Sequence, residues 1–233
     1  MIFGGIQKLT LLDYPDRTAC TLFTTGCNFN CPFCQNKTLI DPATAEDTQA
    51  ISSSEVISFL ETRQGLLDGV CISGGEPLIH DDLDDFLSEV KKLGFLIKLD
   101  TNGSYPDKLH KLIESGMLDC VAMDIKNSPE KYAETIGLPS YNVSPIEESI
   151  KLLRSSSIPF EFRTTVVREF HTEKDLLEIA QWISGADKYY LQGFVDSDGV
   201  MQKGLHGYSA EEMQEFLSSI KTALPNAELR GIK

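Results

Sequence analysis

The sequence lacks any long run of apolar residues. Hydrophobic residues make up 41% of the 233 positions and are well mixed with charged ones, which indicates neither a membrane-spanning helix nor a disordered chain. Residues 1–8 do not place an apolar run behind a basic flank, as a signal peptide would. We therefore expect a cytoplasmic protein, with one domain over residues 1–233 because this length is ordinary for a single α/β domain.

Basic residues are also scarce. The chain has 21 Lys and Arg residues against 35 Asp and Glu, for a net charge of -14. A surface this negative repels the phosphate backbone of DNA and RNA. The composition therefore predicts no nucleic-acid partner.

Cysteines are few and unevenly placed. Of the six in the chain, Cys20, Cys71 and Cys120 each stand alone in an apolar, strand-like segment. A free Cys in such a segment usually behaves as a small buried hydrophobe, and a disulfide framework does not suit a reducing cytoplasm. We expect these three side chains in the core.

The other three cysteines share one short stretch, Gly26 to Cys34. Three residues separate Cys27 from Cys31 and two separate Cys31 from Cys34, so a single loop can surround a metal centre. Closed zinc or iron-sulfur sites use four protein ligands, whereas catalytic sites leave one position open. No fourth Cys or His lies nearby in the sequence, which favours the open site. Two alternatives remain: a zinc site completed by a distant His, and three unligated cysteines.

This spacing, with Phe33 before the last cysteine, resembles the cluster loop of the radical S-adenosylmethionine (SAM) enzymes. The longer stretch from Phe23 to Asn36 is similar to the members that activate glycyl radical enzymes. Among these it most resembles the anaerobic ribonucleoside-triphosphate reductase activating proteins, and next the pyruvate formate-lyase activating enzyme. The resemblance covers roughly residues 5–195. It implies that Cys27, Cys31 and Cys34 hold a 4Fe-4S cluster and that SAM is the second cofactor.

Strand and helix signals alternate along the chain. Helix starts are indicated where capping residues precede apolar residues at helical spacing, and Ser52 with Glu55 and Ser144 with Glu147 have the spacing of a capping box. An acidic linker is expected at 41–50, and a Gly-rich loop at 193–208. The expected strands are 18–23, 69–73, 95–99, 120–123, 160–167 and 189–191, and the expected helices begin near Ser52, Asp81, Pro106, Ser144, Thr172 and Ser209.

Six strand-plus-helix units in strict alternation imply a parallel sheet with right-handed crossovers. A closed eight-unit barrel takes about 250 residues, so six units suggest a partial (β/α)6 barrel that is open on one side. A flat, doubly wound sheet is the rival architecture. The family resemblance favours the open barrel, with its core over about 18–195 and a C-terminal extension over 196–233.

Unusual polar clusters follow four successive predicted strands. The cysteine loop follows the first, Gly74 to Pro77 the second, Asp100 to Asn102 the third, and Asp124 with Lys126 the fourth. Carboxyl ends of parallel strands share one face, where active sites of such folds lie. Singly, these motifs could be a tight turn and solvated carboxylates; together they predict one site.

The resemblance also implies individual roles. The glycines and the glutamate of the second motif would bind the SAM amino group, while Lys126 and Arg163 would bind its carboxylate, although an ordinary ion pair is the alternative for these two. Asp100, Thr101 and Asp124 would be able to hold a monovalent cation. The complete set of predicted SAM contacts is Phe33, Gln35, Gly74, Gly75, Glu76, Asp100, Thr101, Asn102, Asp124, Ile125, Lys126, Arg163 and Gln192.

Histidines contribute nothing to this predicted site. The pyruvate formate-lyase activating enzyme has a cofactor-contacting histidine after its sixth strand, where this chain has Gln192. The four histidines match no ligand or triad spacing. They are expected on the surface or in loops: His80, His110, His171 and His206.

The activity that the resemblance implies is generation of a radical. A flavodoxin or ferredoxin would reduce the cluster, SAM would be cleaved to methionine and a 5'-deoxyadenosyl radical, and that radical would take a hydrogen atom from a glycine of a partner enzyme. Residues 1–17 and 193–233 are the expected partner-facing segments. The alternatives are a radical SAM enzyme acting on a small molecule of the deazapurine type, and a non-catalytic zinc-binding module.

Overall fold

Nine strands form one sheet in the computed structural model of this chain, which describes residues 1–40 and 50–232. The strand order is β3-β1-β2-β4-β5-β6-β7-β8-β9. Strand β1 is antiparallel to both of its neighbours, and every pair from β2 to β9 is parallel. The strands are β1 (Ile2–Thr10), β2 (Ala19–Thr24), β3 (Ile51–Ser52), β4 (Gly69–Gly74), β5 (Leu96–Thr101), β6 (Cys120–Asp124), β7 (Phe160–Val166), β8 (Tyr189–Gly193) and β9 (Ala227–Arg230).

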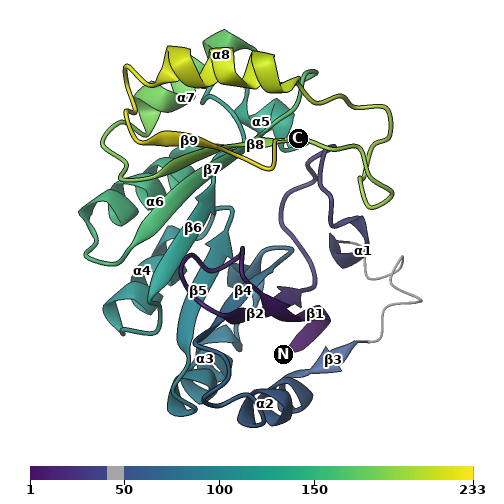
Figure 1. Cartoon of the computed structure of the whole chain (residues 1–233), viewed down its shortest axis with the longest axis vertical. Helices are drawn as coiled ribbons and strands as arrows, with labels where there is room; N and C mark the ends of the chain where they lie inside the picture. The colour runs from purple at the N-terminus through teal and green to yellow at the C-terminus, as the bar shows by residue number, and fades with distance from the viewer. Residues whose placement is uncertain (41–49, 233) are drawn as a thin grey trace.

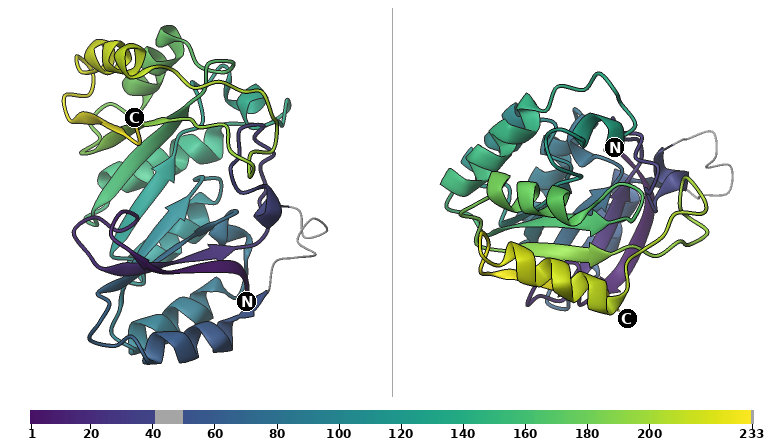
Figure 2. Two further views of the ribbon diagram at one scale, coloured as in Figure 1. Left: turned by 45° about the vertical axis from the view of Figure 1, so that its right-hand side comes forward. Right: turned by 90° about the horizontal axis from the view of Figure 1, so that it is seen from above.

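The sheet is strongly curved and its two edges stay apart, so that it forms a barrel open on one side (Figures 1 and 2). The longer helices cover the convex face of this sheet, while α1 lies near the open side (Figure 1). The helices are α1 (Lys37–Ile40), α2 (Ser53–Glu61), α3 (Leu83–Lys92), α4 (Pro106–Glu114), α5 (Tyr132–Thr135), α6 (Ser144–Ser155), α7 (Glu173–Trp182) and α8 (Ala210–Ile220), with a 3-10 turn η2 (Pro77–Ile79) after β4.

Alternation along the central strands separates an apolar face from a polar one. In β5, Ile97 and Leu99 are fully buried in the hydrophobic core, while the intervening Lys98 pairs with Asp100. Successive side chains of a strand point to opposite faces, so the apolar set packs under the outer helices and the charged set faces the barrel interior. The interior is therefore charged at the level where the predicted site lies.

The six predicted strands are confirmed to within two residues as β2, β4, β5, β6, β7 and β8. Helix-starting capping boxes are confirmed at Ser52, Thr172 and Ser209. The capping box expected at Ser144 is wrong: this residue is already inside α6, and its hydroxyl donates to Asn142 Oδ1 at 2.8 Å. Asparagine side chains compete for such local bonds, and here Asn142 takes the hydroxyl that would have capped the helix.

Three strands were not expected from the sequence. β1 replaces the predicted N-terminal lead-in, β3 is two residues long, and β9 adds a parallel strand beyond β8. The acidic linker expected at 41–50 lies, apart from Ala50, outside the described residues. Within the part of the chain that the structure describes, no helix is long and apolar enough to cross a membrane.

The three isolated cysteines are in the core as predicted. Cys20 and Cys71 are fully buried, and Cys120 is 8% exposed. Each lies on a strand, on β2, β4 and β6 respectively. None of them belongs to the loop that follows β2.

Candidate functional site

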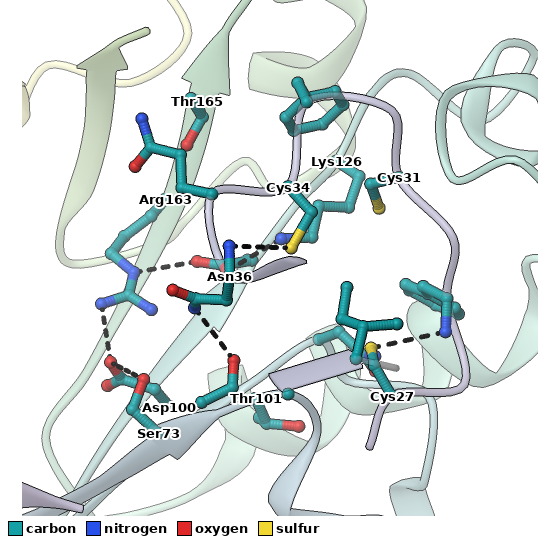
Figure 3. Close-up of a pocket in the computed structure, with 18 of the residues that line it drawn as sticks. Cys27, Cys31, Cys34, Asn36, Ser73, Asp100, Thr101, Lys126, Arg163 and Thr165 are labelled. Carbon is teal, nitrogen blue, oxygen red and sulfur yellow. Dashed lines mark hydrogen bonds and ion pairs between the residues drawn. The ribbon is translucent and has the colours of Figure 1, made fainter. Parts of the chain in front are cut away.

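A cavity of about 350 Å³ lies at the carboxyl ends of the parallel strands. The cysteine loop forms one part of its wall, and Arg163 and Asp100 form another (Figure 3). Apart from Glu76 and Ile125, every residue predicted for the metal and cofactor site lines this cavity. They are Cys27, Cys31, Phe33, Cys34, Gln35, Gly74, Gly75, Asp100, Thr101, Asn102, Asp124, Lys126, Arg163 and Gln192.

The cysteine loop is held in place by the Gly-rich loop 193–208. Met201 N donates to Cys34 O at 2.9 Å, and Gln202 N donates to Pro32 O at 2.8 Å. These two backbone hydrogen bonds hold the Gly-rich loop against the end of the cysteine loop. Part of the segment expected to face a partner is thus bound to the site itself.

The three loop thiols are free and all face the cavity. Backbone N–H groups donate to two of them: Phe29 N to Cys27 Sγ and Asn36 N to Cys34 Sγ, both at 3.4 Å. Such bonds stabilise thiolates that carry iron-sulfur clusters.

A zinc ion and a 4Fe-4S cluster require different distances between their thiol ligands. Ligands of one tetrahedral zinc ion would lie about 4 Å apart, and among the described residues no three His, Cys, Asp or Glu side chains are placed to hold a single ion. In a 4Fe-4S cluster each thiolate binds a different iron, which requires wider spacing. In this structure Cys27, Cys31 and Cys34 share the cavity wall, and among the described residues they do not form a ready site for a single ion.

Burial favours the protonated form of these thiols as long as no metal ion is bound beside them. Loss of solvent raises the pKa of Cys27 to about 11 and that of Cys31 to about 12, although Lys126 lowers both. Bound iron would supply the additional positive charge that a thiolate needs.

The turn after β4 is packed against the start of the cysteine loop. Gly74 has a φ of +113°, which is accessible to glycine and strained for other residues. A Cβ on Gly75 would lie 1.8 Å from Gly26 O, and the same oxygen accepts a hydrogen bond from Glu76 N at 2.9 Å. The two glycines therefore allow direct contact between the backbones of the two motifs.

Glu76 lies beneath the cavity and does not line it. Its side chain is fully buried, Oε1 accepts from Leu78 N at 3.1 Å and from Thr101 Oγ1 at 2.8 Å, and Oε2 accepts from Asn102 N at 2.6 Å. Burial raises the pKa of this carboxyl to about 7, despite the bonds from Asn102 and Thr101. Its predicted contact with an ammonium group stays a prediction; in this structure the carboxylate fixes the end of β5.

Asn102 links that strand end to the cysteine loop. Its Nδ2 donates to Asn28 Oδ1 at 2.9 Å and lies 4.0 Å from Cys27 Sγ. Glu76 thus holds the backbone of Asn102, and Asn102 in turn holds the loop beside its first thiol.

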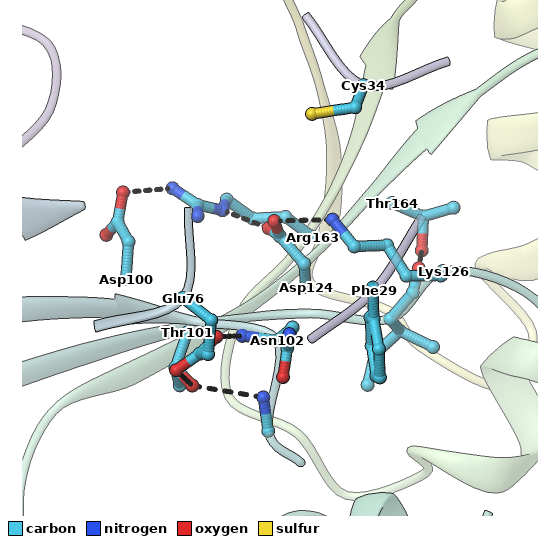
Figure 4. Close-up of polar contacts among 12 residues, drawn as sticks. Phe29, Cys34, Glu76, Asp100, Thr101, Asn102, Asp124, Lys126, Arg163 and Thr164 are labelled. Carbon is cyan, nitrogen blue, oxygen red and sulfur yellow. Dashed lines mark hydrogen bonds and ion pairs between the residues drawn. The ribbon is translucent and has the colours of Figure 1, made fainter. Parts of the chain in front are cut away.

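Four charged side chains form a row along the cavity wall (Figure 4). Arg163 lies between two carboxylates, with Nη1 3.2 Å from Asp100 Oδ2 and Nε 2.9 Å from Asp124 Oδ1. Lys126 Nζ ends the row, 2.9 Å from Asp124 Oδ2. Burial alone would raise the pKa of each carboxyl, but the neighbouring cations, Arg163 foremost, lower both.

His171 lies in the loop between β7 and α7, which agrees with the prediction of surface or loop positions, but its side chain is not at the surface. It is fully buried, Nδ1 lies 3.1 Å from Val167 N, and Nε2 lies 2.8 Å from Lys126 O. A neutral ring that accepts at Nδ1 and donates at Nε2 satisfies both contacts. Phe33 packs on the same ring at a centroid distance of 6.3 Å, so His171 supports both the cysteine loop and the backbone of Lys126.

Ile125 belongs to the hydrophobic core, where it is fully buried. Its backbone N–H and C=O groups both bind β7. Ile125 N donates to Arg163 O at 2.8 Å, and Thr164 Oγ1 donates to Ile125 O at 2.8 Å. It therefore positions its two charged neighbours.

Several lining residues were not found from the sequence, namely Asp13, Phe29, Asn36, Ile40, Ser73 and Thr165. Asp13 comes from the connection between β1 and β2, and its Oδ2 accepts from Thr21 Oγ1 at 2.5 Å. In the sequence, the only signal that could have identified Asp13 as a site residue is a carboxylate placed between apolar residues and Pro15.

Comparison with protein families agrees with this geometry. The family described as the Radical SAM superfamily matches residues 21–183. A protein of Methanocaldococcus jannaschii, provisionally named a glycyl-radical enzyme activating enzyme, is 29% identical over 99% of this chain and 96% of its own length. The pyruvate formate-lyase-activating enzyme of Listeria monocytogenes is 28% identical over 70% of this chain and 68% of its own length.

A similar fold occurs in the crystal structure of Streptococcus suis SuiB bound to its precursor peptide SuiA. The TM-score is 0.71 at 15% sequence identity, over 91% of this chain and 48% of the SuiB chain. The present chain therefore spans about half the length of that protein, and the likeness concerns the fold.

We predict that Gly75→Ala lowers the iron bound after anaerobic reconstitution several-fold. The added methyl group would collide with the Gly26 carbonyl and push the turn away from the cysteine loop, at a cost of about 1–3 kcal/mol. The matched control is Gly65→Ala, where φ is +75° and no heavy atom lies within 4 Å of the added Cβ. It should lose stability but keep its iron; equal iron loss in both variants would contradict the close-contact explanation.

We also predict that the stability lost by His171→Gln depends on pH. Burial lowers the pKa of His171 below its ordinary value of about 6.5. Below pH 6.5 the unfolded chain takes up a proton that the folded chain excludes, so the wild-type advantage shrinks as pH falls. Urea unfolding at pH 7.5 and 5.5 measures this difference, and a gap that widens at pH 5.5 would contradict a buried neutral ring.

Proposed function

The chain belongs to the radical SAM superfamily, and we propose that it is an activating enzyme that generates a glycyl radical on a partner protein. The observation that carries the proposal is that three free thiols of one loop and the cations Lys126 and Arg163 line the same cavity. The two relatives named above as activating enzymes support the same class of activity.

Cys27, Cys31 and Cys34 would hold three irons of a 4Fe-4S cluster and leave the fourth free. When bound, the reduced cluster would supply the electron that cleaves SAM to methionine and a 5'-deoxyadenosyl radical. The main contribution of the chain would be to position the cofactor and not to transfer protons, because the chelated cofactor must be held with its sulfonium beside the cluster.

The cavity supplies complementary groups for the cofactor. Lys126 and Arg163 would bind the SAM carboxylate, since ionised donors make the stronger hydrogen bonds to such groups. The amino group would lie against the turn of Gly74 and Gly75, where no side chain blocks the backbone. Glu76 would act from below, by fixing Thr101 and Asn102 at the strand end.

The partner would be a glycyl radical enzyme, most specifically the anaerobic ribonucleoside-triphosphate reductase. The resemblance of the stretch from Phe23 to Asn36 supports this choice. The open side of the barrel would allow a loop of the partner to reach the cofactor, and a flavodoxin or ferredoxin would supply the electron. A small-molecule substrate of the deazapurine type is the competing possibility.

Changing any one of Cys27, Cys31 and Cys34 to Ala should abolish the visible iron-sulfur absorption and the release of 5'-deoxyadenosine. Each change removes one of the three thiols that line the cavity, and none of the other three cysteines lines it. Cys71→Ala is the matched control, because this buried thiol lies on β4 outside the loop. It should cost about 1 kcal/mol of stability and leave the cluster intact. Retained SAM cleavage in all three loop variants would refute the cluster assignment.

Incubation with the anaerobic reductase tests the proposed partner. After reconstitution, reductant and SAM should yield a glycyl radical doublet on the reductase in electron paramagnetic resonance. The same mixture without SAM should give none. SAM cleavage without any doublet would reject this partner while leaving the superfamily chemistry standing.

A further inference from the structure

The guanidinium of Arg163 lies between the two carboxylates that the family resemblance assigns to a monovalent cation. Nη1 is 3.2 Å from Asp100 Oδ2 and Nε is 2.9 Å from Asp124 Oδ1. The side chain is only 13% exposed, so it is enclosed by the barrel. A positive charge from the chain itself thus bridges Asp100 and Asp124 (Figure 4).

The remaining carboxylate oxygens are also paired with cations. Lys98 Nζ contacts Asp100 Oδ1, and Lys126 Nζ is 2.9 Å from Asp124 Oδ2. Every oxygen of the two carboxylates therefore has a cationic partner. Through Arg163 this group is also linked to Glu161 and Arg230, and the seven linked side chains carry four positive and three negative charges. A metal ion among them would be repelled at short range in a poorly screened interior.

Thr101 does not complete a metal site either. Its hydroxyl donates to Glu76 Oε1 at 2.8 Å and accepts from Gly103 N at 3.1 Å. The hydroxyl is therefore engaged with Glu76, which lies beneath the cavity that Thr101 and Asp100 line. The three residues assigned to a monovalent cation therefore do not fit one.

We propose that Arg163 takes the place of a monovalent metal ion in this site, so that the cofactor cavity works without bound potassium or sodium. A guanidinium can bridge two carboxylates and still present a further edge. Among the described residues none accepts a hydrogen bond from Nη2, which leaves this nitrogen for the SAM carboxylate. Arg163 then organises the two aspartates and binds the cofactor with the same group.

Thallium(I), which mimics potassium and scatters X-rays anomalously, is the direct probe. Crystals of the reconstituted holoenzyme, soaked with thallium with and without SAM, should show no anomalous peak between Asp100 and Asp124. Arg163→Ala, which vacates the space between the carboxylates, should show one there. A peak in the wild type, in either state, would overturn the proposal, as would a folded Arg163→Ala protein without one.

A solution measurement gives a second readout. The unfolding temperature of the wild type should be the same in potassium, sodium and choline chloride at equal ionic strength. That of Arg163→Ala should rise by about 2–4 °C when potassium replaces choline, a difference of the size that one restored interaction gives. A wild-type protein that is more stable in potassium than in choline would contradict the proposal that Arg163 takes the place of a metal ion.

Arg230→Ala is the matched control for removal of a guanidinium. Arg230 Nη1 is 3.0 Å from Glu161 Oε1, and this residue touches neither aspartate in the contacts described. The variant should gain no thallium peak between Asp100 and Asp124 and should respond to potassium as the wild type does. A gain equal to that of Arg163→Ala would show a general charge effect and count against the proposal.

The inference concerns the cofactor cavity of the proposed function, but its test does not require SAM cleavage or a partner. A thallium peak in the wild type would remove the role of Arg163 as a metal substitute. It would leave the cluster assignment and the activating function untouched.

Discussion

The carbonyl oxygen of Gly26 joins the two motifs on which the site depends. It accepts a hydrogen bond from Glu76 N at 2.9 Å and lies where any side chain on Gly75 would have to go. Through this contact the loop with the three thiols is fastened to the end of β4. Asn102, held by Glu76, adds a second attachment from the end of β5. The position of the cysteine loop relative to the ends of β4 and β5 is thereby set by one backbone contact and one chain of side-chain contacts.

The charged interior of the barrel follows from alternation along its strands. Charged residues at alternate positions of β5 and β7 face inward, and their charges are paired across β5, β6 and β7, as in the link from Asp100 through Arg163 to Asp124. Burying unpaired charges would be costly, so the strands must carry opposite charges at matching levels. The result is a rigid, nearly balanced wall that still exposes cationic edges to an anionic group of a ligand.

Much of the fold and the site follows from the sequence because both depend on short-range patterns. Apolar strands with capped helices between them predict the parallel sheet, and the rule that strand ends share a face brings Cys27, Gly74, Asp100 and Lys126 together. Other features depend on contacts between distant segments. β1 and β9 are recognised only by the strands they pair with, and burial of His171 depends on Lys126 and Val167, neither of which marks it in the sequence.

The central claim is that three cysteines hold a four-iron cluster whose remaining iron binds SAM. A crystal structure of the anaerobically reconstituted protein with SAM tests it most directly. We predict one 4Fe-4S cluster on Cys27, Cys31 and Cys34, with the amino and carboxylate groups of SAM on the fourth iron. A single ion with a complete set of protein ligands, or a disulfide between two of these cysteines, would contradict the account.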